Sequence, residues 1–171
     1  MILITVGQER FPFDRLLRLA DEAVAGGEVE GPAFAQTGCS AYVPRSFPHT
    51  GFLPPDKLRE LIRGSTFVIT HGGVGTVVQC LEEEKVPLIL PRDPLRGEHL
   101  DGHQLEFSAR LEAEGRVLVA HDDADFRAKL RDYGRLIRGL RAGRRPPLKA
   151  PLIAFLRDFS RQVPNRRSAV S

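Results

Sequence analysis

The chain has 171 residues, of which 42% are hydrophobic, 27% charged and 7% aromatic, a profile typical of a globular protein with one domain. No run of residues approaches the ~18 to 20 apolar residues of a membrane-spanning helix, and the N-terminus lacks the basic stretch and cleavage site of a signal peptide, so we expect neither. Two cysteines are too few for a disulfide scaffold, which predicts reduced thiols in the cytosol.

Charge is unevenly distributed along the sequence. The net charge is +3, but residues 127–171 contain 13 Lys or Arg and 2 Asp or Glu, a local charge of +11 that leaves −8 for the rest. A basic C-terminal quarter predicts contact with anionic lipid, nucleic acid or an acidic partner. The alternative is an arginine-rich helix that is simply solvated.

Short apolar runs alternate with segments of helical periodicity in the first 119 residues. In chain order, we expect strands at 1–6, 33–36, 41–43, 67–70, 86–90 and 117–119, and helices at 13–24, 54–65, 76–84 and 103–114. Such alternation predicts an α/β fold, a Rossmann-like parallel sheet with helices on both faces.

The pattern changes after Ala124. Five apolar residues form one helical stripe: Phe126, Leu130, Tyr133, Ile137 and Leu140. We expect the globular domain to span residues 1–142, followed by a linker and C-terminal helix at 143–163 and a disordered tail at 164–171. The apolar face of that helix predicts contact with a partner and consists of Leu152, Phe155, Leu156, Phe159 and Val163.

The segment Thr70–Thr76, THGGVGT, is a candidate phosphate-binding turn. A strand ends at Thr70 and a helix begins near Thr76, so unpaired backbone N–H groups and the positive end of the helix dipole are left for an anion. The alternative is a tight turn whose glycines serve packing alone. The dinucleotide fingerprint fits poorly because Val78 occupies its third glycine position, and the Lys-Ser/Thr pair of a P-loop is missing.

A second polar cluster, residues 91–106, follows the next strand and therefore leaves the sheet at the same edge. Its charges and amides can hydrogen-bond the hydroxyls of a polyol. His99 and His103 could bind a metal with Glu98 or Asp101, but Gly102 interrupts the helix that this arrangement needs, so we expect no metal.

Four motifs, in this order, resemble the C-terminal, nucleotide-sugar-binding domain of family 28 glycosyltransferases, which is half of a GT-B enzyme. They are IxVGxxxFPFD at Ile4–Asp14, AQxG at Ala35–Gly38, HGGxGT at His71–Thr76 and PRxxxxGEHxDxHQ at Pro91–Gln104. The likeness runs from Met1 to about Val119. It is strongest to the split members, namely the catalytic subunit of the eukaryotic dolichyl-diphosphate N-acetylglucosamine transferase and the PssE-like subunits of bacterial exopolysaccharide and capsule synthesis.

This resemblance implies a metal-independent, inverting hexosyltransferase subunit that uses a UDP-sugar as substrate, without a cofactor. The acceptor would be a polyprenyl-diphosphate-linked sugar, presented by a membrane-anchored partner subunit that also supplies the general base. The chain would lie in the cytoplasm at the inner face of the cell membrane through this partner, near an anionic membrane surface, and would not bind nucleic acid. The alternative is a nucleotide-sugar-binding or regulatory module without catalysis.

The resemblance also implies a role for individual residues. Gly7 and Gln8 would line the diphosphate, the backbone at Phe52 and Leu53 would meet uracil, and Gln79 would grip the ribose where the larger family often has an acidic residue. Phosphate and sugar contacts would come from His71, Gly72, Gly73, Gly75, Thr76, Arg92, Glu98, His99, His103 and Gln104. Arg92 could pair a sugar carboxylate or serve the diphosphate. No catalytic base is identified, and His71 is the only fallback.

Overall fold

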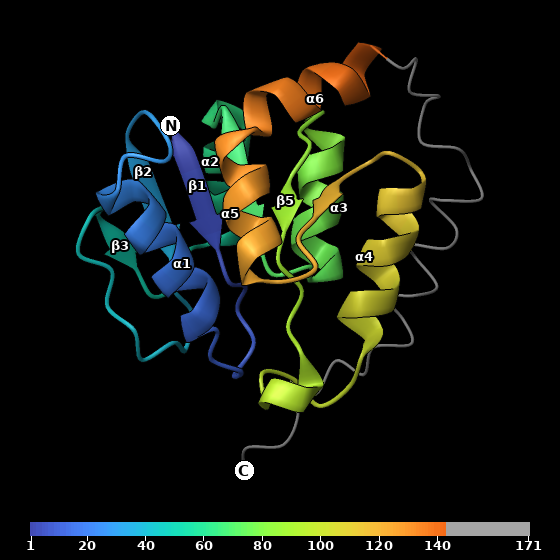
Figure 1. Ribbon diagram of the computed structural model, residues 1–171. Helices are drawn as coiled ribbons and strands as arrows, with labels where there is room; N and C mark the ends of the chain where they lie inside the picture. Colours follow the sequence, from blue (N-terminus) through green and yellow to red (C-terminus); the bar gives the residue numbers. More distant parts are fainter. Residues whose placement is uncertain (143–171) are drawn as a thin grey trace.

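The computed structural model describes residues 1–142, which form a parallel sheet between two layers of helices (Figure 1). Six strands lie in the order β3-β2-β1-β4-β5-β6, and every pair of neighbours is parallel. Their bounds are β1 Ile2–Thr5, β2 Ala33–Gln36, β3 His49–Thr50, β4 Phe67–Thr70, β5 Leu88–Ile89 and β6 Leu118–Val119. The predicted Rossmann-like α/β fold is confirmed.

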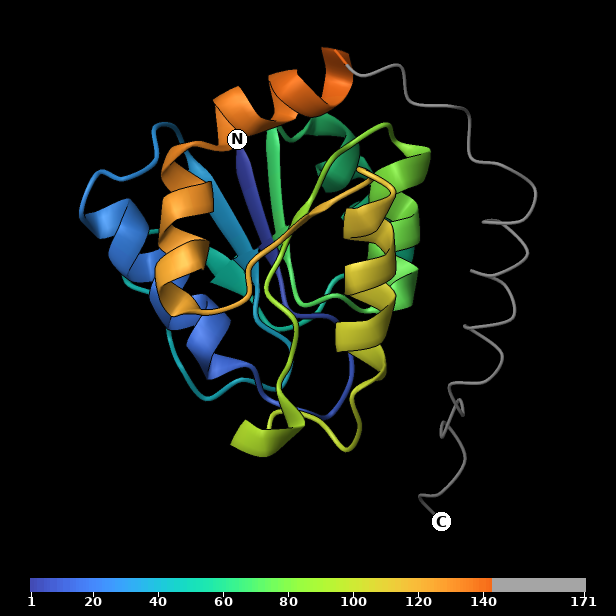
Figure 2. The ribbon, with the colours of Figure 1, turned by 45° about the vertical axis from the view of Figure 1, so that its right-hand side comes forward.

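The helices cover both faces of the sheet. They are α1 Asp14–Ala25, α2 Pro55–Gly64, α3 Val74–Glu82, α4 His103–Ala113, α5 Asp123–Arg131 and α6 Tyr133–Ala142, with a short 3-10 helix, η1, at Pro94–Arg96. Helices α1 and α5 pack on one face and α2, α3 and α4 on the other, while α6 crosses the end of the sheet where the strands begin (Figures 1 and 2).

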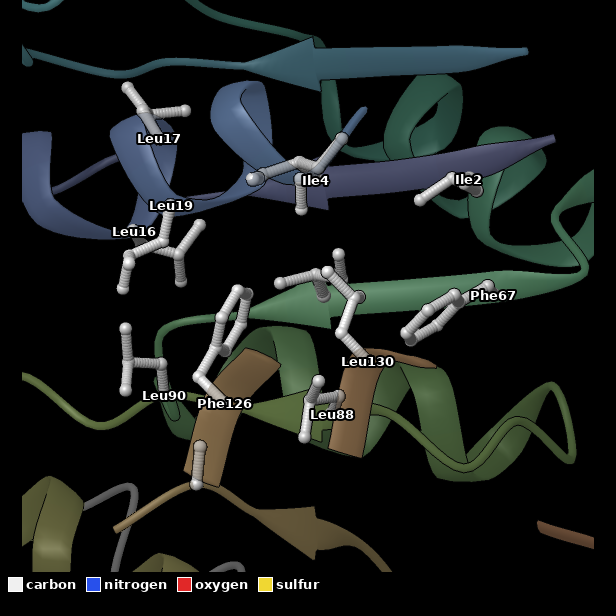
Figure 3. Packing of buried hydrophobic residues seen from close by; sticks show 14 of the residues in the cluster. Ile2, Ile4, Leu16, Leu17, Leu19, Phe67, Leu88, Leu90, Phe126 and Leu130 are labelled. Atoms are coloured by element: carbon white, nitrogen blue, oxygen red, sulfur yellow. The ribbon is translucent and has the colours of Figure 1, made fainter. Parts of the chain in front are cut away.

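Alternate side chains of each central strand enter opposite layers because successive Cβ atoms point to opposite faces. Ile4, Ile69 and Leu88 face α1 and α5, where they pack with Leu16 and Phe126 (Figure 3). Their neighbours Leu3, Val68 and Ile89 face α2, α3 and α4. Burial on both faces explains why the strands are continuous apolar runs.

The predicted strand at 41–43 is wrong, and the third strand is instead β3. Carboxylates of α1 bind the backbone donors that a strand would have used. Asp14 accepts from the N–H of Ala41 and of Tyr42, at 2.9 and 3.1 Å, and Asp21 accepts from those of Arg45 and Ser46. The segment is therefore an ordered loop.

The predicted continuous helix after Ala124 is divided at Asp132 into α5 and α6. Its apolar stripe is nevertheless directed at the core, with Phe126, Leu130 and Tyr133 buried. The Tyr133 ring stacks on Phe67, and its hydroxyl donates a 2.6 Å hydrogen bond to the carbonyl of Val86. The linker, C-terminal helix and tail predicted at 143–171 lie outside the described residues.

The strand order reverses between β1 and β4, because β1 pairs with β2 on one side and with β4 on the other. The loops after these two strands run to opposite faces of the sheet. In open α/β sheets, ligands bind outside the carboxyl ends of the strands at such a switch point.

Candidate functional site

The imidazole of His71 lies between two glycines at this switch point. A Cβ on Gly7, the residue that follows Val6 at the end of β1, would lie 2.6 Å from His71 Nε2, and a Cβ on Gly73 would also collide with that atom. Gly7 has a φ of +81°, a conformation that side-chain-bearing residues rarely adopt. Both glycines are therefore required for two loops to close on the ring. These are residues 6–13 after β1, called the β1 loop below, and residues 71–73 after β4, called the β4 loop.

His71 is neutral at physiological pH. His71 is only 3% exposed, and its Nδ1 lies 3.2 Å from Thr70 Oγ1. Burial, with the nearby charges of Arg92 and His99, lowers the pKa of His71 well below its usual value, although a hydrogen bond with the Thr5 backbone opposes this. The ring therefore packs against Gly7 and Gly73 as an uncharged group.

The predicted phosphate turn has the expected shape of strand, sharp turn and helix. Gly72 has a φ of +83°, and a Cβ there would lie 2.9 Å from Ser108 Oγ. Gly73 then caps α3 without a side-chain hydrogen bond, so the N–H groups of the first helical turn have no intrahelical acceptor. A Cβ on Gly75 would meet no atom within 4 Å. The N-terminus of α3 is open to a bound anion, beside Thr76.

Gln36, the last residue of β2, joins the loops that follow β1 and β3, a role that we did not predict. The buried side chain accepts a 2.5 Å hydrogen bond from Thr5 Oγ1 and donates from Nε2 to the carbonyls of Gly7 and Gly51, at 2.6 and 3.1 Å. Only the AQxG motif at Ala35–Gly38 singled out this residue.

The predicted uracil-contacting residues lie beside the β1 loop. Gln8 Nε2 donates a 2.7 Å hydrogen bond to the carbonyl of Leu53, so the loops after β1 and β3 are tied together. Phe52, in the loop after β3, is 54% exposed. The structure therefore leaves a flat apolar ring available at this edge.

Helices α3 and α4 carry buried polar atoms without hydrogen-bond partners among the described residues. These atoms are Gln79 Oε1, Gln104 Oε1 and Ser108 Oγ. Buried acceptors are nearly always satisfied in native proteins, so each of these atoms requires an explanation. Ser108 Oγ and the backbone carbonyl of Gln104, one helical turn apart on α4, both lie against Gly72, so this face of α4 adjoins the phosphate turn.

The other predicted residues of the 91–106 cluster are largely engaged with the protein. Both oxygens of Glu98 accept hydrogen bonds from Arg15, at 2.7 and 2.8 Å. His99 Nε2 lies 3.4 Å from Glu9 Oε2, and its Nδ1 lies 3.3 Å from Asp101 Oδ1. His103 Nδ1 is 3.1 Å from the same Asp101 oxygen, with half of its side chain exposed.

Arg92 does not project from the edge at all. Arg92 is fully buried, and its guanidinium lies under the β1 loop.

Within residues 1–142, no three His, Cys, Asp or Glu side chains are grouped to hold a metal ion. A hollow of about 570 Å³, lined by Arg18, Ala41, Tyr42, Val43 and Arg45, contains none of the predicted site residues.

Part of the basic C-terminal quarter pairs with the acidic body of the domain. Arg127 forms ion pairs with Glu22 and Glu28, and Arg131 pairs with Glu28 as well. These arginines therefore link α5 to α1 and to the loop that follows α1. None of the helices in the described part of the chain is long and apolar enough to cross a lipid bilayer.

No protein-family model and no curated protein matches the sequence. Solved structures do match. The glycotransferase of kitacinnamycin superimposes with a TM-score of 0.51 at 16% identity, over 96% of this chain and 44% of that one. The glycosyltransferase SnogD from Streptomyces nogalater gives a TM-score of 0.44 at 18% identity, over 91% of this chain and 44% of that one.

The chain thus spans less than half the length of either glycosyltransferase. Likeness at this level of identity shows the fold, which is that of a Rossmann-like half of a GT-B glycosyltransferase, as predicted. The narrower assignment to family 28 stays a prediction.

Proposed function

We propose that the chain is the donor-binding subunit of a glycosyltransferase and holds a UDP-sugar at the switch point between β1 and β4. The observation that carries this proposal is the position of the neutral His71 ring between Gly7 and Gly73, directly beside the open N-terminus of α3. A diphosphate there would meet backbone N–H groups and the positive end of a helix dipole. Gly75, where an added Cβ would meet no atom within 4 Å, leaves room for its close approach.

Neighbouring groups suit the other two parts of a UDP-sugar. The exposed Phe52 ring and the Gln8–Leu53 hydrogen bond lie on the β3 side of the site, where a pyrimidine could stack. The unpaired Gln79 Oε1 on α3 would accept from a ribose hydroxyl, and Gln104 Oε1 on α4 would accept from a hydroxyl of the sugar. His103, at the start of α4, would join that set.

The proposed reaction is an inverting transfer. The oxygen of an acceptor hydroxyl attacks the anomeric carbon, the bond from that carbon to the diphosphate breaks, and UDP leaves with the electron pair while a general base takes the hydroxyl proton. The α3 N-terminus would stabilise the charge that develops on the departing diphosphate. His71 is buried beneath the phosphate turn, so we assign the general base to a partner chain.

A partner at this edge is supported by exposed apolar side chains. Leu95 and Leu100 lie between β5 and α4, and Leu105 is in the first turn of α4, with side chains 96%, 69% and 43% exposed. Together with Phe52 they lie on segments that follow the carboxyl ends of strands. Exposed apolar residues at one edge of a sheet are what a docking partner would cover. We propose that the partner is membrane-anchored and presents a polyprenyl-diphosphate-linked sugar in exopolysaccharide or capsule synthesis.

The test is transfer of radiolabelled sugar from a UDP-sugar to a polyprenyl-diphosphate-linked acceptor, by this chain with and without the product of the neighbouring gene. The proposal expects labelled lipid only when both chains are present. Binding of UDP-sugar without transfer in any combination would favour the alternative, a nucleotide-sugar-binding or regulatory module. Truncation after Ala142 should preserve UDP binding and abolish association with the partner.

A further inference from the structure

Arg92 bridges the two ends of the β1 loop from below. This residue lies three positions after the end of β5, and a single guanidinium nitrogen, Nη2, donates to the carbonyl of Val6 at 2.8 Å and to that of Phe11 at 2.9 Å. The guanidinium also lies over the Phe13 ring, with its central carbon 5.3 Å from the ring centroid. Arg92 therefore closes the segment that carries Gly7 and Gln8.

The charge of this buried guanidinium is poorly compensated. Its ion-pair partner is Glu9, whose Oε2 lies 3.6 Å from Nη1 and whose side chain is 47% exposed. Nε and Nη1 have no hydrogen-bond partner among the described residues, and the oxygens of nearby Glu98 are bonded to Arg15. Burial lowers the pKa of Arg92 to about 10, so the group remains a cation at neutral pH.

A buried, weakly paired cation destabilises a fold, so its presence points to a use of its charge elsewhere in the molecule. The nearest site that would benefit is the switch point, since Val6 directly precedes Gly7 and the Arg92 charge reaches His71. The guanidinium itself is enclosed, so a ligand at the edge would not touch it.

We propose that Arg92 is a positioning residue for the diphosphate: it closes the β1 loop around Gly7 and adds a positive charge beneath the site that Glu9 only partly offsets. This inference rests on the proposed function. In this proposal Arg92 does not touch the ligand. It acts by holding the β1 loop in place and by its electrostatic field.

A phosphate series separates this role from a purely structural one. Uridine, UMP and UDP share the nucleoside and differ in negative charge, so binding of all three is measured by calorimetry on the whole chain and on Arg92→Met, Arg92→Lys and Glu9→Gln. Arg92→Met should weaken UDP most, by about tenfold, UMP less and uridine least, because loss of the loop closure affects all three ligands whereas loss of the cation affects only the charged ones. Arg92→Lys should restore most of the UDP affinity, and Glu9→Gln should tighten UDP a few-fold without changing uridine.

A second measurement needs no ligand. His71 is faced by the charges of Arg92 and His99, so loss of the Arg92 cation should raise the pKa of His71 in an NMR titration, and Arg92→Lys should not. Should Arg92→Met fail to fold, Arg92→Lys and Glu9→Gln still test the charge.

Equal losses for uridine, UMP and UDP, or an unchanged UDP affinity in Glu9→Gln together with an unmoved His71 pKa in Arg92→Met, would overturn the inference and leave the proposed function standing. A wild-type chain that binds none of the three ligands would overturn both.

Discussion

Gln36 donates a 2.6 Å hydrogen bond from Nε2 to the carbonyl of Gly7, across the boundary between β2 and the β1 loop. The same nitrogen reaches Gly51, at 3.1 Å, so one buried amide holds the loops that follow β1 and β3 in register. The candidate site is thus built on an internal scaffold before any ligand is present.

Gln36→Leu should therefore lower the free energy of unfolding by about 1–3 kcal/mol, because it removes the hydrogen bonds to the buried carbonyl of Gly7 and from Thr5 Oγ1. The Gly51 carbonyl keeps its bond from the Gly38 N–H. Urea unfolding measures this change. Thr37→Val is the matched control and should cost less, since Thr50 O keeps its 2.8 Å bond from the Thr37 N–H after the hydroxyl is removed. Equal losses in the two variants would show that Gln36 has no special part in joining the loops.

Gly75→Ala separates the phosphate-binding interpretation of the α3 turn from the packing interpretation. An added Cβ meets open space in the free protein, and alanine in a helix is favoured over glycine, so the variant should be more stable by up to about 0.5–1 kcal/mol. If backbone N–H groups there hold a diphosphate, the same methyl group should weaken UDP binding.

Gly139→Ala in α6 is the control, because its added Cβ also meets open space and α6 lies at the opposite end of the sheet (Figure 1). It should leave UDP affinity unchanged. Unchanged affinity in Gly75→Ala as well would favour glycines that serve packing alone.

Gln79 and Gln104 should recognise different parts of the UDP-sugar. Gln79→Met should weaken UDP and UDP-sugar alike by roughly 1–3 kcal/mol, because both contain the ribose, whereas Gln104→Met should weaken only the UDP-sugar. Each substitution removes a buried oxygen that has no partner among the described residues, so stability should hardly fall. Calorimetry with both ligands on both variants makes the comparison. The same pattern of loss in the two variants would refute the assignment.

The buried His71 should make stability depend on pH below about 6.5. Above that value the ring is neutral in both the folded and unfolded states. As the pH falls below it, the unfolded state takes up a proton while the lowered pKa keeps the folded ring neutral, so stability is lost by up to about 1.4 kcal/mol per pH unit.

Urea unfolding between pH 5 and 7.5 should therefore show a flatter profile for His71→Gln than for the wild type. The exposed His121 provides the control, and His121→Gln should keep the wild-type slope. A wild-type slope in His71→Gln would show that the buried ring does not control this dependence.

The sequence predicted the parallel sheet and the glycine turn because both rest on local signals, namely apolar runs and glycines between a strand and a helix. It did not reveal the interior contacts that shape the site. The loop at 41–43 depends on Asp14 and Asp21, far away in sequence, and the burial of Arg92 depends on carbonyls more than 80 residues away. Similarly, nothing local shows that the Glu98 carboxylate is engaged by Arg15.

The central claim is that a UDP-sugar donor binds at the switch point, and amide chemical shifts of the ¹⁵N-labelled chain titrated with UDP test it most directly. The account predicts saturable changes that are largest at Gly7 and at Gly72–Thr76, with smaller ones around Phe52 and Gln79. Changes confined to another part of the chain, or an unchanged spectrum at saturating UDP, would contradict it.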